Sequence, residues 1–179
     1  MTRSDELSMD LRRLGEREIP EVMALMRDVI SRLPSQELFA MDDEAYFRDY
    51  LLANGEIYGV YLDGKLVAYT SLSFPKHSES NLGREFGVPE KELPKVACLE
   101  ATVVHESVRG LGLQRRFHAL RERRAIAYGA GWLYSTVHPD NASSIRNLEA
   151  AGFARRFTRP MYGGKPRHCY VKRLASSPF

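Results

Sequence analysis

The chain has 179 residues, of which 44% are hydrophobic and 27% are charged, and its formal net charge is +3. This length predicts one domain over residues 1–179, and the composition excludes a disordered chain. The small positive surplus does not by itself indicate a nucleic-acid-binding protein. We find no apolar run that could serve as a leader or cross a bilayer, and the two cysteines lack metal-ligand spacing. We therefore expect a cytoplasmic protein without a metal ion.

The first half of the sequence predicts a strand, two helices and a hairpin. Residues 9–16 alternate in the manner of a strand, and apolar residues at helical spacing predict an amphipathic helix over residues 18–33. A second helix is expected over residues 42–54, with acidic residues in its first turn. Two β-rich runs within residues 56–74 flank Asp63-Gly64, a dipeptide typical of a tight hairpin turn.

The second half begins with residues 75–95, a polar stretch with three prolines that predicts a long surface loop. Helices and strands then alternate. The expected strands cover residues 96–104, 132–137, 153–158 and 167–174, and the expected helices cover residues 113–129 and 143–152. This order predicts an α/β protein with one central mixed sheet and helices on its faces. The last strand could be an edge strand that pairs with a second copy, so a homodimer is possible.

A glycine-containing turn joins the strand at 96–104 to the helix at 113–129, and its sequence is Val108-Arg109-Gly110-Leu111-Gly112-Leu113-Gln114. Glycines let the chain bend sharply and let a ligand approach the backbone. The first N–H groups of a helix have no internal partner and carry partial positive charge, which suits a phosphate. The P-loop pattern is missing, and Arg115 stands where the dinucleotide fingerprint requires its third glycine.

This turn resembles the R-x-x-G-x-G/A loop of the GNAT superfamily of acyl-CoA-dependent N-acyltransferases. Downstream, STVHPDNASSIRNLEAAGF resembles the strand, asparagine, helix and terminal Gly-Phe of the same family. The resemblance covers residues 98–153. It implies an α+β fold with a mostly antiparallel sheet of about six to seven strands and about four helices. It also implies that acetyl-CoA is the cosubstrate and that a primary amine of a small molecule or peptide attacks its thioester directly.

The resemblance further implies which residues bind acetyl-CoA. Backbone groups around Val103 and Val104 would pair with pantetheine, and the amides from Arg109 to Gln114 would hold the pyrophosphate. Arg115 or Arg116 would meet the 3′-phosphate, although the arginines of this helix could equally form a solvated face. The implied cofactor-binding residues are Val103, Val104, Arg109, Gly110, Leu111, Gly112, Leu113, Gln114, Arg115, Asn141 and Ser144.

The sequence departs from the family pattern at two positions. Gln114 replaces the last Gly/Ala of the loop. Leu148 occupies the position where many family members carry a tyrosine that protonates the leaving thiolate. The general acid that the family commonly uses is therefore missing.

Glu100 is the candidate general base, because a carboxylate in an otherwise apolar strand is costly unless it faces a polar cleft or a partner. It could equally be a structural carboxylate paired with an arginine. Tyr134 is a possible substitute acid, and the alternative is a packed aromatic residue. His105 and His138 are weaker candidates that more simply belong to loops.

The acceptor site is the least defined part of the sequence. Acidic and aromatic residues in residues 34–47 could attract a cationic amine, but Asp42 and Asp43 could equally be the favourable start of a helix. The residues concerned are Glu37, Phe39, Asp42, Asp43, Glu44, Tyr46 and Phe47. Two other functions remain open: a non-catalytic acyl-CoA-binding module and a basic RNA-binding protein. We expect neither nucleic acid nor membrane as a partner.

Overall fold

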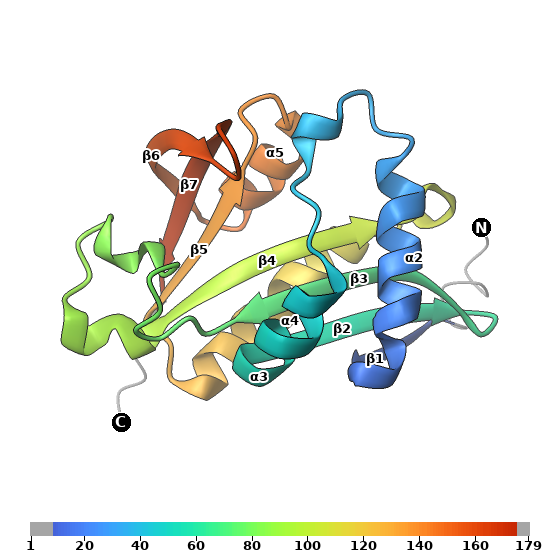
Figure 1. The fold of residues 1–179 in the computed structure, drawn as a ribbon, viewed down its shortest axis with the longest axis horizontal. Helices are drawn as coiled ribbons and strands as arrows, with labels where there is room; N and C mark the ends of the chain where they lie inside the picture. Colours follow the sequence, from blue (N-terminus) through green and yellow to red (C-terminus); the bar gives the residue numbers. More distant parts are fainter. Residues whose placement is uncertain (1–8, 175–179) are drawn as a thin grey trace. The chain divides into compact units, whose positions relative to one another are not determined.

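The computed structural model describes residues 9–174, and their strands form a seven-stranded mixed sheet in the order β1-β2-β3-β4-β5-β7-β6 (Figure 1). Only the β4–β5 pair is recorded as parallel, whereas β1–β2, β5–β7 and β6–β7 are antiparallel. The expected mixed, mostly antiparallel sheet is thus confirmed. The strands are β1 (Asp10–Leu14), β2 (Gly55–Leu62), β3 (Lys65–Ser73), β4 (Val96–Val104), β5 (Trp132–Val137), β6 (Ala154–Met161) and β7 (Lys165–Arg173).

The described chain divides into two compact units. Unit 1 comprises residues 9–71 and 100–117, and unit 2 comprises residues 72–99 and 118–174. Strand β4 and the long helix α4 (Leu113–Tyr128) each contribute residues to both units. A single domain over residues 1–179 remains a prediction, and each unit is described by itself.

In unit 1, the amphipathic helix α2 (Ile19–Ile30) lies across strands β1 to β3 (Figure 1). Its predicted apolar stripe is confirmed, because seven of its twelve residues are buried. They pack with Phe47, Leu51 and Tyr69 in one hydrophobic cluster. The hairpin turn is confirmed as well, since Asp63 and Gly64 both have positive φ, at 50° and 75°.

The second predicted helix begins later than its sequence suggests and is not a regular α-helix. Helical residues run from Glu44 to Asn54, and Tyr46–Leu51 form a π-helix, labelled η3, before α3 (Leu52–Asn54). The backbone N–H of Leu52 donates to the carbonyl of Phe47, five residues earlier. Such π-helical turns occur frequently at functional sites.

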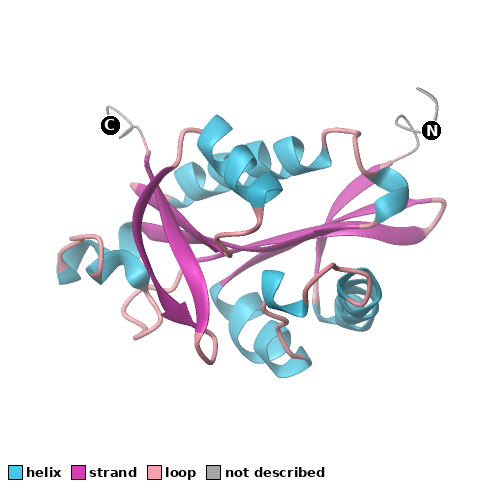
Figure 2. Cartoon of the chain, turned by 90° about the horizontal axis from the view of Figure 1, so that it is seen from above, coloured by secondary structure: helices cyan, strands magenta, loops and turns pink. Residues whose placement is uncertain are grey.

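Unit 2 contains α5 (Ala142–Ala150), β5 and the twisted pair of strands β6 and β7 that leads to the C-terminus (Figure 2). The expected edge position of the last strand is wrong, because β7 lies between β5 and β6 and hydrogen-bonds to both. The edge strand is β6, which connects to β7 through the Tyr162-Gly163-Gly164 turn, whose residues all have positive φ. The expected loop at 75–95 contains two short 3₁₀ helices, η4 (Leu82–Arg84) and η5 (Glu90–Lys95).

His118 of α4 makes the stability of unit 2 dependent on pH. Its Nδ1 is buried without a hydrogen-bond partner among the described residues. Burial, and then the positive charges of Arg121 and Lys172, lower the pKa of His118 from 6.5 to about 4. The unfolded chain binds a proton at His118 more tightly than the folded chain does. Keeping His118 neutral therefore adds to the free energy of unfolding above pH 6.5, and this stabilisation is lost as the pH falls toward 4.

We therefore expect acid to destabilise the wild type more than the variant His118→Phe. Between pH 7 and pH 4.5, the free energy of unfolding should fall by on the order of 2 kcal/mol more in the wild type. Urea unfolding of both proteins at the two pH values measures this difference. Parallel losses in both proteins would contradict the prediction.

Candidate functional site

The glycine-containing turn is an open loop between β4 and α4. After the short 3₁₀ helix η6 (Glu106–Val108), the chain reaches α4 through Gly110 and Gly112, whose φ angles are 80° and 78°. These angles lie in the left-handed region that favours glycine. Among the described residues, apart from the immediate chain neighbours, no atom lies within 4 Å of the point where a Cβ would stand at either glycine. Both glycines are therefore required by backbone conformation rather than by packing.

The loop presents a run of backbone amides that have no recorded hydrogen-bond acceptor among the described residues. The first recorded helical bond joins the N–H of Arg116 to the carbonyl of Gly112, at 3.0 Å. Within residues 9–174, the six preceding amides, from Gly110 to Arg115, donate to no recorded acceptor. A helix start of this kind binds anions, because its N–H groups and its dipole both favour negative charge. The residues present thus fit the pyrophosphate of a coenzyme.

An ion-pair network anchors this loop to α2, and sequence reasoning missed it. The Arg32 guanidinium pairs with Asp28 at 2.6 Å and with Glu106 at 2.8 Å. The hydrogen bond from Arg32 lowers the pKa of Glu106 to about 2. Val108 and Leu113, at the two ends of the loop, are buried in one hydrophobic cluster. Arg32 and Glu106 lie 74 positions apart, so no local pattern could have predicted their ion pair, whereas Asp28 and Arg32 have the i,i+4 spacing of a helical pair.

The backbone of β4 points in alternate directions beside the loop. The N–H of His105 donates to the carbonyl of Val67 on β3, at 2.9 Å. Alternation along an antiparallel strand then turns the backbone groups of Val103 toward β3 and those of Val104 away from it. The hydroxyls of Thr70 and Thr102 lie 2.6 Å apart, which fits the same register. Of the two residues predicted to contact pantetheine, only Val104 has backbone N–H and C=O groups that point away from β3.

Glu100 is half-buried and accepts a hydrogen bond. The Tyr46 hydroxyl of η3 donates to Oε1 of Glu100 at 2.8 Å. Tyr46 is itself fixed by Asp43, whose Oδ1 accepts from the Tyr46 N–H at 2.7 Å, and by a stacked contact with Tyr50. The expectation that Asp43 starts a helix is confirmed. The sequence suggested Tyr46 only as part of an acidic and aromatic segment, not as the partner of Glu100.

Comparison with known proteins decides the family. The model of the acetyltransferase (GNAT) family matches residues 23–153, which is most of the chain. This protein is a member of the GNAT family. A search of curated proteins found no match.

Solved structures share the GNAT fold at low sequence identity. An N-acetyltransferase from Staphylococcus aureus Mu50 has a TM-score of 0.69 and 14% identity, covering 93% of this chain and 99% of that chain. A Salmonella typhimurium protein solved with its cofactor acetyl-CoA has a TM-score of 0.69 and 15% identity, covering 96% and 97%. A ribosomal-protein-alanine N-acetyltransferase from Brucella melitensis has a TM-score of 0.68 and 18% identity, covering 92% and 99%. These likenesses show the fold.

The remaining GNAT site residues predicted from sequence belong to unit 2. Tyr134 is buried, packs edge-on against Phe86, and has its hydroxyl 3.4 Å from the N–H of Leu82. Asn141 caps α5, because its side-chain oxygen accepts from the N–H of Ser144 at 3.2 Å. The acid role of Tyr134 and the cofactor contacts of Asn141 and Ser144 stay predictions.

Both candidate histidines lie at strand ends, where each accepts a hydrogen bond from the backbone N–H two residues later. Nδ1 of His105 accepts from the N–H of Ser107 at 3.0 Å, and Nδ1 of His138 accepts from the N–H of Asp140 at 3.0 Å. Arg115 is exposed at the start of α4.

In the described part of the chain, no three His, Cys, Asp or Glu side chains form a metal-binding group. No helix within residues 9–174 is both long and apolar enough to cross a membrane.

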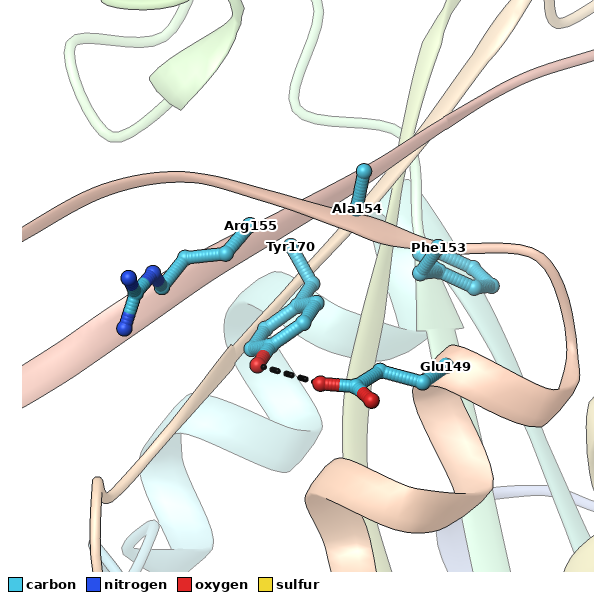
Figure 3. Close-up of a pocket in the computed structure, with 5 residues that line it drawn as sticks. All are labelled: Glu149, Phe153, Ala154, Arg155 and Tyr170. Atoms are coloured by element: carbon cyan, nitrogen blue, oxygen red, sulfur yellow. Dashed lines mark hydrogen bonds between the residues drawn. The ribbon is translucent and has the colours of Figure 1, made fainter.

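A surface pocket in unit 2 lies outside all predicted site residues (Figure 3). It is lined by Glu149, Phe153, Ala154, Arg155 and Tyr170. The Tyr170 hydroxyl donates to Oε1 of Glu149 at 3.2 Å, so the two polar groups at its floor satisfy each other. Nothing in this pocket calls for a ligand.

Proposed function

We propose that this GNAT protein transfers an acetyl group from acetyl-CoA to a primary amine. The observation that carries the proposal is the run of six amides from Gly110 to Arg115, between η6 and the first turn of α4, which donate to no recorded acceptor within residues 9–174. The amides would hold the pyrophosphate, and the N–H of Val104 would donate to the thioester oxygen as negative charge develops there.

Glu100 would act as the general base. A free aliphatic amine has a pKa of about 10.4, so it must lose a proton before or during its attack. The Tyr46 hydroxyl donates to Oε1 of Glu100 and helps to orient the carboxylate that would take the proton.

The leaving thiolate would not need a proton from the residue at position 148. Acetyl-CoA supplies the acetyl group on a thiol whose ordinary pKa is about 8.5, which makes the thiolate a tolerable leaving group. Leu148 is buried in the hydrophobic cluster of unit 2 and has no proton to give.

Two measurements test the proposed function. Acetyl-CoA at about 100 times its Kd should raise the free energy of unfolding by roughly 2.7 kcal/mol. Release of free thiol from acetyl-CoA should then depend on an added amine. Binding without amine-dependent release would favour a non-catalytic acyl-CoA-binding module, and no binding would overturn both functions.

A further inference from the structure

The glycine-containing turn is held at its ends rather than along its length. At Gly110 and Gly112, no described atom beyond the immediate chain neighbours lies within 4 Å of the point where a Cβ would stand. Val108 and Leu113, by contrast, are buried in one hydrophobic cluster, with 0% and 3% of their surface exposed. The direction of the amides between them therefore depends on how firmly these two ends are placed.

The end that precedes the turn belongs to η6, whose backbone is closed by hydrogen bonds. The N–H of Val108 donates to the carbonyl of His105 at 3.1 Å, and the N–H of Arg109 donates to that of Glu106 at 3.3 Å. These bonds tie the residues of η6 to one another. A contact that holds Glu106 therefore also places Val108 and Arg109.

Arg32, which follows the end of α2, holds Glu106 with two hydrogen bonds. Its Nε lies 3.0 Å from Oε1 of Glu106, and its Nη2 lies 2.8 Å from Oε2. The same guanidinium is also bidentate to Asp28, with Nη1 2.6 Å from Oδ1 and Nη2 3.0 Å from Oδ2. Two carboxylates thus fix the guanidinium plane, a geometry that the planar fork of arginine permits and the point charge of lysine does not.

The position of Glu106 is unfavourable on grounds of charge. It lies four positions before Gly110, and a carboxylate close to a phosphate site weakens anion binding by repulsion. It also engages Arg109, a predicted coenzyme-binding residue, with 3.8 Å between Oε1 and Nη2. The side chains of Arg32 and Glu106 are 44% and 34% exposed, and ion pairs that exposed contribute little to stability. Placement of the turn accounts for Glu106, whereas charge and stability do not.

We propose that Arg32 and Glu106 are positioning residues, which set the direction of the amides from Gly110 to Arg115 and thereby the affinity for the pyrophosphate of acetyl-CoA. All of these residues belong to unit 1. This inference rests on the proposed function and adds to it two residues that would not touch the coenzyme. Its consequence is unusual in sign: removing the negative charge of Glu106 should weaken the binding of an anion.

Three neutralising variants separate positioning from charge. We would measure the Kd of acetyl-CoA by calorimetry for Arg32→Gln, Glu106→Gln and the double variant. Positioning predicts that each single variant weakens binding by about 10-fold and that the double variant loses no more, because the two residues act as one unit. Charge alone predicts weaker binding in Arg32→Gln, tighter binding in Glu106→Gln and a nearly unchanged Kd in the double variant, and that pattern would overturn the proposal.

Two further variants test the geometry of the contact. Arg32→Lys keeps the charge but not the planar fork, so it should weaken binding nearly as much as Arg32→Gln. Arg27→Gln removes the same charge from an exposed position of α2 whose side chain has no recorded partner within residues 9–174, so it should leave the Kd unchanged. Without acetyl-CoA, all variants should keep nearly the Tm of the wild type. A wild-type Kd in Arg32→Lys would contradict the positioning role.

A donor without the pyrophosphate, S-acetylpantetheine, provides the kinetic readout. In Arg32→Gln and Glu106→Gln, the KM for acetyl-CoA should rise by about 10-fold at an unchanged kcat, whereas kcat/KM for S-acetylpantetheine should stay the same. Equal losses with both donors would overturn the positioning role.

The binding and kinetic measurements also distinguish this inference from the proposed function. If acetyl-CoA binds more weakly to both single variants but no amine is acetylated by the wild type, the proposed function fails and the positioning role stands. If the wild type acetylates amines and both single variants keep its Kd, the function stands and the positioning role fails. An absence of acetyl-CoA binding to the wild type would overturn both.

Discussion

Replacing Glu100 with glutamine is expected to lower kcat for acetyl transfer by about 10²- to 10⁴-fold, the usual contribution of a positioned general base. Glutamine keeps the size of the side chain and an oxygen that can accept from the Tyr46 hydroxyl, which lies 2.8 Å from Oε1 of Glu100. It cannot take a proton from the amine. Steady-state kinetics of thiol release with a saturating amine measures the effect.

The matched variant is Tyr46→Phe, which leaves the carboxylate but removes the bond that orients it. We expect a smaller loss than in Glu100→Gln, and an unchanged affinity for acetyl-CoA in both variants. If Glu100→Gln keeps the wild-type rate but lowers the free energy of unfolding, Glu100 is a structural carboxylate and the base lies elsewhere.

Replacing Gly112 with valine should abolish the stabilisation by acetyl-CoA, which is roughly 2.7 kcal/mol at 100 times Kd in the wild type. Gly112 has a φ of 78°, and a β-branched residue is strained there, so the backbone of the loop must move. That movement redirects the amides from Gly110 to Arg115. Thermal unfolding with and without acetyl-CoA reports the loss directly.

The β2–β3 turn supplies the control for backbone strain. Gly64 has a φ of 75° and, like Gly112, no atom near the position of a Cβ. Gly64→Val should therefore lose a similar roughly 1–2 kcal/mol of stability but keep the full stabilisation by acetyl-CoA. If acetyl-CoA stabilises Gly112→Val as strongly as it stabilises Gly64→Val, the glycine-containing turn is only a turn.

Sequence patterns predicted the elements with strong local signals. The bounds of β4 and β5 agree with the predicted residues 96–104 and 132–137, because both are apolar runs that end at polar or glycine residues. The turn at Asp63-Gly64 was predictable from the tolerance of these residues for positive φ. The placement of β7 between β5 and β6 was not predictable in this way, because a hairpin signal such as Gly163-Gly164 indicates that β6 pairs with β7 but not which of the two pairs with β5.

Site residues could be predicted only where the residue type is unusual for its immediate sequence context. Glu100 could be selected because a carboxylate interrupts an apolar strand. Its partner Tyr46 lies 54 positions away, and the network of Arg32 with Glu106 spans 74 positions. Such pairings follow from packing rather than from spacing. The pKa of Asp42 likewise depends on burial and on Glu100, neither of which a local pattern contains.

The π-helical turn at Tyr46–Leu51 makes the surroundings of Glu100 sensitive to the number of residues in the turn. A regular α-helix advances each residue by about 100° around its axis. A deletion of one residue after Tyr46 that restored regular winding would therefore swing Tyr46 and the segment before it around the helix, while Leu51 stayed in the core. One codon gained or lost here would reposition the partner of Glu100 without any substitution, so the number of residues in this turn, and not only their identity, sets the geometry around Glu100.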